Sequence, residues 1–370
     1  GQTRGGTLKD GLAEWMARAE GNSFIDYGFH MMVTDVHEGT LAEFAEMMHE
    51  GVTTFKLFTA YPGVNLSDDR QILEAMQVAA SIGATIMMHA ENGIAIDLLR
   101  DEAVANGDTD PINHLLTRPA SMEGEAVHRV AALAEIAGCP LVIVHISSQD
   151  AFAEAVVARD RGLPVFAETC PQYLWLSQED VPEGFEGAKF VCSPPLRRRG
   201  EGHQTALWSG ISTGRVDAVA TDHCPFTWEQ KEAGRGDFRK IPNGLGVVEH
   251  RMDLVFQGVV EGWIPLTRWI EVTAETPAKI SGLYPRKGTI APGSDADVVI
   301  YNPSASHVLS AETHHMNLDY SVFEGAEVGG TVETVLLRGE VIVDEGEFVG
   351  TPGRGEYLPR GTNSLLPEGT

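Results

Sequence analysis

The chain has 370 residues, of which 43% are hydrophobic and 22% are charged, and its formal net charge is −26. This length allows one large domain and a smaller one, and the composition is that of a globular protein. The negative charge argues against nucleic acid and anionic membrane surfaces as partners, because both carry charge of the same sign. We find neither an apolar run of transmembrane length nor a secretory leader pattern.

Residues 1–286 alternate between helix-like and strand-like stretches. Thr40 and Glu43 form a capping-box pattern at the start of a predicted helix. Ser67 is expected to cap the next one. The helices are predicted over 8–20, 40–50, 68–82, 123–137 and 151–161, and the strands near 27–33, 52–57, 84–89, 140–146, 163–168 and 216–222.

Four of these strands end in a side chain that can bind a metal ion, and each follows a helix-like stretch that stops at a glycine. The carboxyl ends of parallel strands in a βα barrel open onto one rim, so these side chains are expected to converge. Such a set indicates a hydrolytic metal centre. The four residues are Lys56 in VTTFKLFTAY, His89 in ATIMMHAEN, His145 in PLVIVHISS and Asp222 in DAVATDHCPF.

Six strands are two fewer than a closed barrel of this kind needs. Residues 190–197 (FVCSPPLR) contain two prolines and are expected to form a loop, not a seventh strand. We therefore expect a TIM-like (β/α)8 barrel over 1–286 whose first two βα units precede Gly1. Short β-rich runs then predict a small β-sandwich over 287–350. Residues 351–370 are expected to be an extended tail that docks on the body or on a neighbouring subunit.

Lys56 lies between Phe55 and Leu57 in an apolar strand. Taken alone it is more simply a strand-end lysine whose ammonium group reaches solvent. A desolvated lysine can also lose its proton and add carbon dioxide, which gives a bidentate anionic ligand. The three other strand-end ligands favour this second interpretation.

A single histidine at the end of an apolar strand is more often a structural residue than a ligand. His89 and His145 occupy equivalent positions in two units, and imidazole suits zinc and similar divalent ions. Asp222 could bind a metal and also accept a proton from water. The adjacent His223 should point to the other face of the strand.

Three further side chains have ambiguous roles. Glu91 and Glu168 are candidate acceptors for the ligand histidines, and structural hydrogen bonding explains them equally well. Tyr61 follows Lys56 by five residues and could donate to a developing oxyanion. It could equally be an ordinary aromatic residue before Pro62.

The chain resembles the cyclic amidohydrolases, most closely the hydantoinase/dihydropyrimidinase group, over nearly its whole length. No single motif is decisive, but their order along the chain is specific. They are TTFKLFTAYPG, HAEN, VIVHISS, AETCPQYLWL, VCSPPLR, TDHCPF, NGLGVVEHRM, LYPRKGTIAPGSDADVVI and HHMNLDYSVFEG.

This resemblance implies hydrolytic ring opening of a cyclic ureide or imide, such as a hydantoin or a dihydropyrimidine, by a metal-bridging hydroxide. It implies that carboxylated Lys56 bridges two divalent ions, expected to be Zn²⁺, and that His89 and His145 bind the second ion. Asp222 would be a ligand of the first ion and the general base, and Tyr61 would stabilise the oxyanion. The backbones of Ser193 and Asn243 would hold the substrate. It also suggests a homotetramer.

One departure from the family pattern concerns the first metal. The family's first strand ends in a His-x-His pair, and this chain contains no such motif. We expect that pair, and the leading half of the sandwich, before Gly1.

Two other kinds of function stay open on the sequence. Allantoinase and dihydroorotase are the nearest enzymatic alternatives, although no basic residue for a substrate carboxylate can be assigned. The non-catalytic collapsin response mediator proteins share the fold but have lost metal ligands, whereas this chain keeps four. The cysteines contain no CxxC pair, which favours reduced thiols and a cytoplasmic location.

Overall fold

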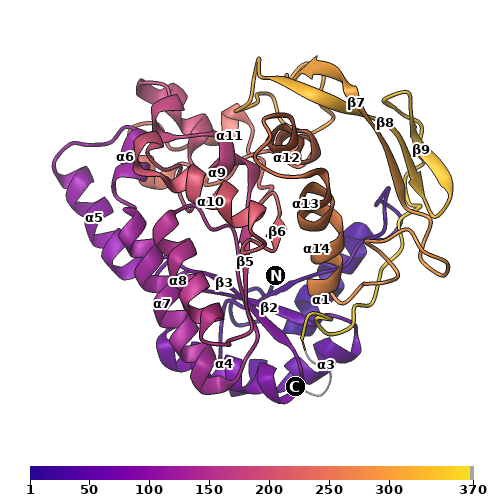
Figure 1. The fold of residues 1–370 in the computed structure, drawn as a ribbon. Coiled ribbons are helices and arrows are strands. Elements are labelled where there is room, and N and C mark those ends of the chain that lie inside the picture. The colour runs from indigo at the N-terminus through magenta and orange to yellow at the C-terminus, as the bar shows by residue number, and fades with distance from the viewer. Residues whose placement is uncertain (367–370) are drawn as a thin grey trace.

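The computed structural model describes residues 1–366. Its main sheet has six parallel strands, whose order in the sheet is their order in the sequence (Figure 1). All six predicted strands are present, and 191–197 is a loop as expected. The strands are β1 (Met31–Met32), β2 (Thr54–Phe58), β3 (Thr85–His89), β4 (Leu141–Ile143), β5 (Val165–Thr169) and β6 (Ala218–Val219).

Helices connect these strands and cover the outside of the sheet, as in a barrel (Figure 1). Within residues 1–366, no helix combines the length and hydropathy that crossing a bilayer requires. The α-helices are α1 (Leu8–Ala19), α2 (Glu38–Ala42), α3 (Phe44–His49), α4 (Asp69–Ser81), α5 (Gly93–Ala105), α6 (Ile112–Leu116), α7 (Ala120–Ala137), α8 (Gln149–Asp160), α9 (Pro171–Trp175), α10 (His203–Ser212), α11 (Trp228–Glu232), α12 (Arg251–Val260), α13 (Leu266–Ile270) and α14 (Thr276–Ile280). Short 3₁₀ turns lie at Gln178–Asp180, Gly184–Phe190, Arg199–Glu201 and Phe238–Lys240, and a π-helical turn lies at Glu271–Glu275.

The predicted capping box at Thr40 is wrong. The helix starts earlier, and the ring of His37 caps α2 by accepting from two backbone amides. Thr40 lies inside α2, where its hydroxyl donates to the Asp35 carbonyl. Glu43 instead accepts from the backbone amide of Leu8 at 2.6 Å, so it caps α1 from a distance.

The predicted cap at Ser67 is also wrong, by one residue. Asp68 accepts from the backbone of Gln71, and the Gln71 side chain accepts from the backbone of Asp68. This is a capping box. A carboxylate also suits the positive end of the helix dipole of α4 better than a hydroxyl does.

The strand register divides the sheet residues between two faces. Lys56 pairs with Met87, Met87 with Val142, and Val142 with Phe166. Met87, Val142 and Phe166 belong to a small apolar cluster that is separate from the main core. Paired residues of a parallel sheet point to the same face. Lys56 therefore points into the barrel interior, while its neighbours face the helices.

A second sheet of four antiparallel strands forms the lobe at the upper right of Figure 1. Its contact with the barrel includes Tyr301, whose ring lies against Phe256 and Trp269 of α12 and α13. A parallel sheet with a separate antiparallel sheet agrees with the predicted fold class. The domain boundaries after 286 and 350 stay predictions. The strands are β7 (Val298–Val308), β8 (Glu327–Leu337), β9 (Glu340–Asp344) and β10 (Glu347–Phe348).

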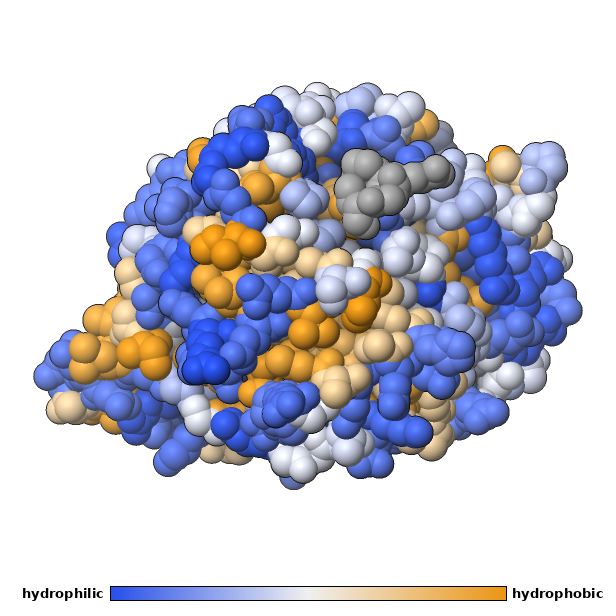
Figure 2. Space-filling view, turned by 90° about the horizontal axis from the view of Figure 1, so that it is seen from below, coloured by the Kyte–Doolittle hydropathy of each residue, from blue (hydrophilic) through white to orange (hydrophobic). Residues whose placement is uncertain are grey.

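The predicted tail is described as far as Leu366, and this part docks on its own chain. Leu358 donates its amide to the Tyr27 carbonyl. The buried guanidinium of Arg360 reaches the barrel interior, where it donates to the Thr54 hydroxyl and the Phe29 carbonyl. Leu366 packs against the apolar cluster at the end where the strands begin. Figure 2 shows the molecule from below, with hydrophobic residues gathered across the middle of this face.

Phe55 lies on the helix-facing side of β2, and its ring stacks on Phe44 with centroids 3.8 Å apart. We predict that Phe55→Ala lowers the free energy of unfolding by about 3–5 kcal/mol, because it leaves a cavity in the core. Chemical denaturation measures this. The matched control is Phe24→Ala, which removes a ring that is 42% exposed and should cost about 1 kcal/mol or less. Equal losses in both variants would contradict the prediction.

Candidate active site

Unusual backbone conformations mark the rim at the carboxyl ends of the strands. Tyr61, His145 and Asp222 have φ angles of 64°, 44° and 47°. Within residues 1–366, only two other non-glycine residues, Arg338 and Glu345, have positive φ. Such conformations are unfavourable for bulky residues and gather at functional sites. Three residues selected from the sequence therefore share a strained backbone.

The left-handed turn at His145 decides where its ring points. Val142 and Val144 face the barrel interior, so strict alternation would turn His145 toward the helices. The positive φ breaks this alternation, and Ile146 takes the helix-facing place instead. As a result, the ring of His145 meets that of His89, with centroids 4.6 Å apart.

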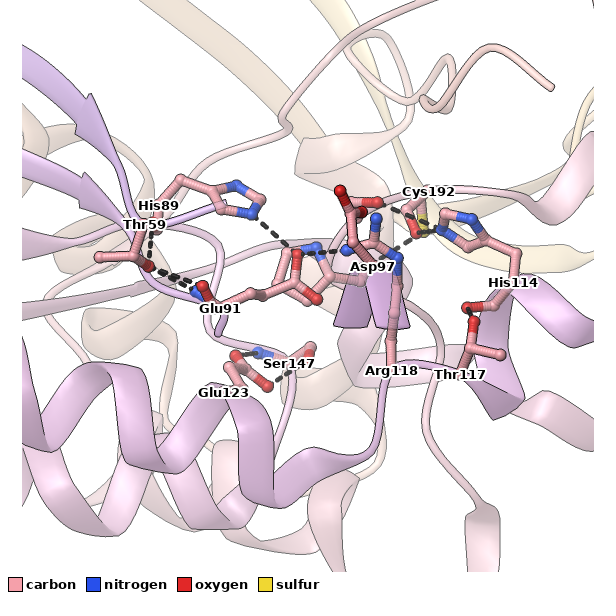
Figure 3. A network of polar contacts seen from close by, with 12 residues as sticks. Thr59, His89, Glu91, Asp97, His114, Thr117, Arg118, Glu123, Ser147 and Cys192 are labelled. Carbon is pink, nitrogen blue, oxygen red and sulfur yellow. Dashed lines mark hydrogen bonds and ion pairs between the residues drawn. The ribbon is translucent and has the colours of Figure 1, made fainter. Parts of the chain in front are cut away.

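The two histidines present nitrogen atoms to each other. His89 Nδ1 lies 2.9 Å from His145 Nε2. The other nitrogen of His89, Nε2, lies 2.8 Å from a carboxylate oxygen of Glu91 and donates to it (Figure 3). Glu91 thus has the predicted place behind His89, and it fixes the tautomer that leaves a lone pair on Nδ1. Burial lowers the pKa of His145 far below its ordinary value, so this ring is neutral.

Glu91 is itself held by Arg118, with 2.9 Å between the guanidinium and the carboxylate, and both side chains are buried. This charge holds the pKa of Glu91 below its ordinary value, against the opposing effect of burial. A second buried ion pair joins Arg197 to Glu123. The Glu123 carboxylate also accepts from the Ser147 hydroxyl (Figure 3). These contacts fix the wall of the site behind His89 and His145.

Lys56 reaches the same region from β2. Its ammonium lies 5.2 Å from the centre of the Phe58 ring, and it has no hydrogen-bond or ion-pair partner within residues 1–366. Burial lowers the pKa of Lys56, although the charges of Asp222 and Glu168 oppose this shift. The lowered pKa increases the share of neutral amine, which is the form that can react as a nucleophile.

Asp222 and His223 diverge, as predicted. Asp222 is exposed at the rim, and its charge acts on both Lys56 and Tyr61. The ring of His223 instead accepts from the backbone amides of Val247 and Val248. Of the two accounts of Glu168 that the sequence left open, structural hydrogen bonding agrees with the structure, because its carboxylate accepts from the backbone amide of His145 at 3.4 Å. Burial raises the pKa of Glu168 to about 7.

Tyr61 lies beside His89 and close to Arg118, whose guanidinium is 5.9 Å from the centre of the Tyr61 ring. The Tyr61 ring is 5.2 Å from that of His89, and burial raises the pKa of its hydroxyl to about 12. Ser193 is near enough to oppose this rise in the pKa of Tyr61, and its hydroxyl lies 3.2 Å from His114 Nε2. Asn243 carries a buried Oδ1 atom without a hydrogen-bond partner.

The imidazole nitrogens of His89 and His145 are donors of the kind that divalent metal ions accept. Two imidazole nitrogens face each other, and His145 Nδ1 is buried without a partner. Within residues 1–366, no three His, Cys, Asp or Glu side chains are close enough to hold an ion. A metal ion held by the two histidines would therefore need a further ligand. The Lys56 side chain would suit that role only in an anionic form.

Comparison with known proteins bears directly on this arrangement. The profile of the amidohydrolase family matches residues 33–342. The chain belongs to the amidohydrolase family. A D-hydantoinase of Streptomyces coelicolor is 58% identical over 367 residues, which are 99% of this amidohydrolase and 78% of that relative. A D-hydantoinase of Rhizobium radiobacter is 45% identical, over 97% of this chain and 79% of its own.

Solved structures agree with the sequence comparison. The crystal structure of dihydropyrimidinase from Brevibacillus agri NCHU1002 matches this amidohydrolase with a TM-score of 0.96 at 44% identity, over 98% of this chain and 79% of that one. The L-hydantoinase (dihydropyrimidinase) from Arthrobacter aurescens matches with a TM-score of 0.88 at 31% identity, over 95% and 77%. The resemblance to the hydantoinase/dihydropyrimidinase group, an enzyme family, is confirmed.

Three side chains around the site of this amidohydrolase were not predicted from its sequence. Arg118 and Arg197 carry no local signal, because the acidic partners that keep them buried lie 27 and 74 residues away in the chain. His114 donates to the Cys192 carbonyl at 2.9 Å beside Ser193. A helical histidine next to a loop gives no pattern that distinguishes it from a surface residue.

We predict that Arg118→Met lowers the free energy of unfolding by about 3–5 kcal/mol at neutral pH, because buried Glu91 loses the guanidinium that neutralises it and keeps only the hydrogen bond from His89. The folded-state pKa of Glu91 is depressed, so the pair's contribution is present above the ordinary carboxyl pKa and is lost as pH falls through the folded value. Urea denaturation at several pH values measures both effects. Arg18→Met, which breaks an exposed ion pair with Glu14, should cost less than about 1 kcal/mol.

Proposed function

We propose that this protein opens cyclic ureides or imides, such as hydantoins and dihydropyrimidines, by metal-dependent hydrolysis of a ring amide bond. The observation that carries the proposal is the convergence of His89 Nδ1 and His145 Nε2, close enough to Lys56 for its charge, in addition to burial, to lower the pKa of His145. The D-hydantoinases that match nearly the whole chain support the substrate class.

In this proposal the residues that would hold two divalent ions, inferred to be Zn²⁺, are carboxylated Lys56, His89, His145 and Asp222. The lowered pKa of Lys56 favours the neutral amine that reacts with carbon dioxide. Such ions supply Lewis acidity, which lowers the pKa of water and polarises a carbonyl group.

The residues of the chain account for the proton and charge movements of the reaction. Water oxygen adds to the ring carbonyl carbon, and Asp222 accepts the proton that the water loses. Tyr61 donates its hydroxyl hydrogen to the oxygen that becomes negative. The C–N bond then breaks, and Asp222 returns the proton to the leaving nitrogen.

The ring substrate needs polar partners beside these groups. We infer that the backbones of Ser193 and Asn243 bind its amide edge, since both segments border the site. The unpartnered Oδ1 atom of Asn243 supports a role in binding a polar ligand.

We also infer a cytoplasmic homotetramer. Three of the four cysteines are buried, and all four are free thiols, which suits a reducing compartment. Helix α5 exposes Ile94 and Leu98 on one face, with 64% and 61% of their surface accessible. Four residues apart on a helix, they form an apolar stripe of the kind that oligomer contacts bury.

The test combines activity with composition. The intact protein, prepared with metal and bicarbonate, is assayed for hydrolysis of dihydrouracil and a 5-substituted hydantoin, and its metal content and intact mass are measured. We expect ring opening, about two zinc ions per chain and a mass increment of one carboxyl group that Lys56→Ala abolishes. Absence of ring opening, metal and mass increment together would refute the proposal.

We predict that Tyr61→Phe lowers kcat by about 10²–10³-fold and changes KM little, because the hydroxyl acts mainly on charge that develops in the transition state. Since the pKa of Tyr61 is raised to about 12, its proton should remain through the mildly alkaline range. Steady-state kinetics between pH 6 and 10 check this. A Tyr61→Phe enzyme with unchanged kcat would show that Tyr61 only fills space.

A further inference from the structure

Lys231 is the only fully buried lysine within residues 1–366, with 0% of its surface exposed. It lies on α11, a short helix whose neighbouring residues Gln230 and Glu232 are exposed, so a lysine there would ordinarily reach water. No carboxylate of the described chain pairs with it, and its neighbours include the Phe226 ring and the thiols of Cys192 and Cys224. Burying an unpaired ammonium is costly, so a compensating interaction is required.

That interaction is a set of three hydrogen bonds to backbone carbonyls. Lys231 Nζ donates to Val191 O at 3.1 Å, to Pro242 O at 2.7 Å and to Gly244 O at 3.0 Å. An ammonium group has three N–H donors and no acceptor, so this set uses its whole capacity. The three carbonyl groups thus form a complete binding site for one ammonium group.

The three carbonyls bracket the two residues proposed to bind the substrate. Val191 lies two positions before Ser193, whereas Pro242 and Gly244 flank Asn243. The two segments are about fifty residues apart in the chain, and outside this cation they share a bond from Gly244 N to Val191 O at 3.0 Å. Lys231 therefore holds them in one arrangement.

The same loop is fixed against the segment that carries Asp222. Cys224 donates its amide to the Leu245 carbonyl at 3.0 Å. A Cβ atom on Gly244 would lie 2.3 Å from the Cys224 carbonyl oxygen, so only glycine permits this approach. Movement of the Asn243 loop would therefore disturb both the protein backbone proposed to bind the substrate and Asp222, the proposed general base.

We propose that Lys231 is a positioning residue, whose ammonium sets the spacing of the Ser193 and Asn243 backbones and thereby the binding of the cyclic amide edge. The inference rests on the proposed function, because it assigns those backbones to the substrate. A positioning role for Lys231 differs from a purely structural one in that its loss should raise KM.

The test compares Lys231→Met with Lys287→Met. Lys287 is partly buried and ion-paired with Asp26 and Asp295, at the contact between the barrel and the antiparallel sheet. We expect both variants to lose thermal stability. Only Lys231→Met should raise KM, by about tenfold or more, with kcat within about threefold of the wild type. A KM within about twofold of the wild type, or an equal rise in both variants, would overturn the proposal.

Two further measurements keep the test decisive. If Lys231→Met does not fold, Lys231→Gln keeps two N–H donors and should give a smaller rise in KM, whereas an unchanged KM would refute the idea. Hydrogen–deuterium exchange should be faster over 190–196 and 241–246 in the Lys231 variants and unchanged over 84–89. If the wild type opened no ring, the proposed function would fail, while exchange would still decide whether Lys231 holds these segments.

Discussion

The parallel register of β2 to β5 is the constraint on which the rest of the molecule depends. It places Lys56 level with Met87 and two further apolar residues in the barrel interior, so the amine has no carboxylate beside it along the sheet. The same register aligns the ends of the strands, where His89 and His145 meet. A shift by one residue would turn all of these side chains toward the helices.

Buried charges in this protein are treated in three different ways. Arg118 is neutralised by a carboxylate that also orients a histidine. Lys231 is surrounded by carbonyl dipoles, which keeps its position fixed without a counter-ion. Lys56 has neither kind of partner, and burial lowers its pKa. Burial also lowers the pKa of Lys231, to about 8, but its three carbonyl partners stabilise the ammonium form. Lys56 lacks such partners within residues 1–366, so its lowered pKa favours a neutral amine that can be modified.

Much of the fold and part of the site follow from local pattern. Strands preceded by a glycine-terminated helix were found, and period-two alternation is enough to point Lys56 and His89 inward. The position of His145 is not deducible in this way, because a left-handed turn overrides the alternation. The helix caps predicted at Thr40 and Ser67 are wrong, because several neighbouring polar residues could serve as the cap. Lys231 resembled a surface residue, because one of the carbonyls that hold it lies 40 residues away.

The Arg360 contact has a consequence for how the polypeptide acquires its structure during synthesis. The guanidinium bonds to Thr54, which precedes it by 306 residues, and to the Phe29 carbonyl. The segments that contain Phe29 and Thr54 must therefore leave the ribosome with these groups hydrated. Their contact with Arg360 can form only after translation has passed that residue. Co-translational folding thus includes a step after residue 360, in which the segments around Phe29 and Thr54 join the segment around Arg360.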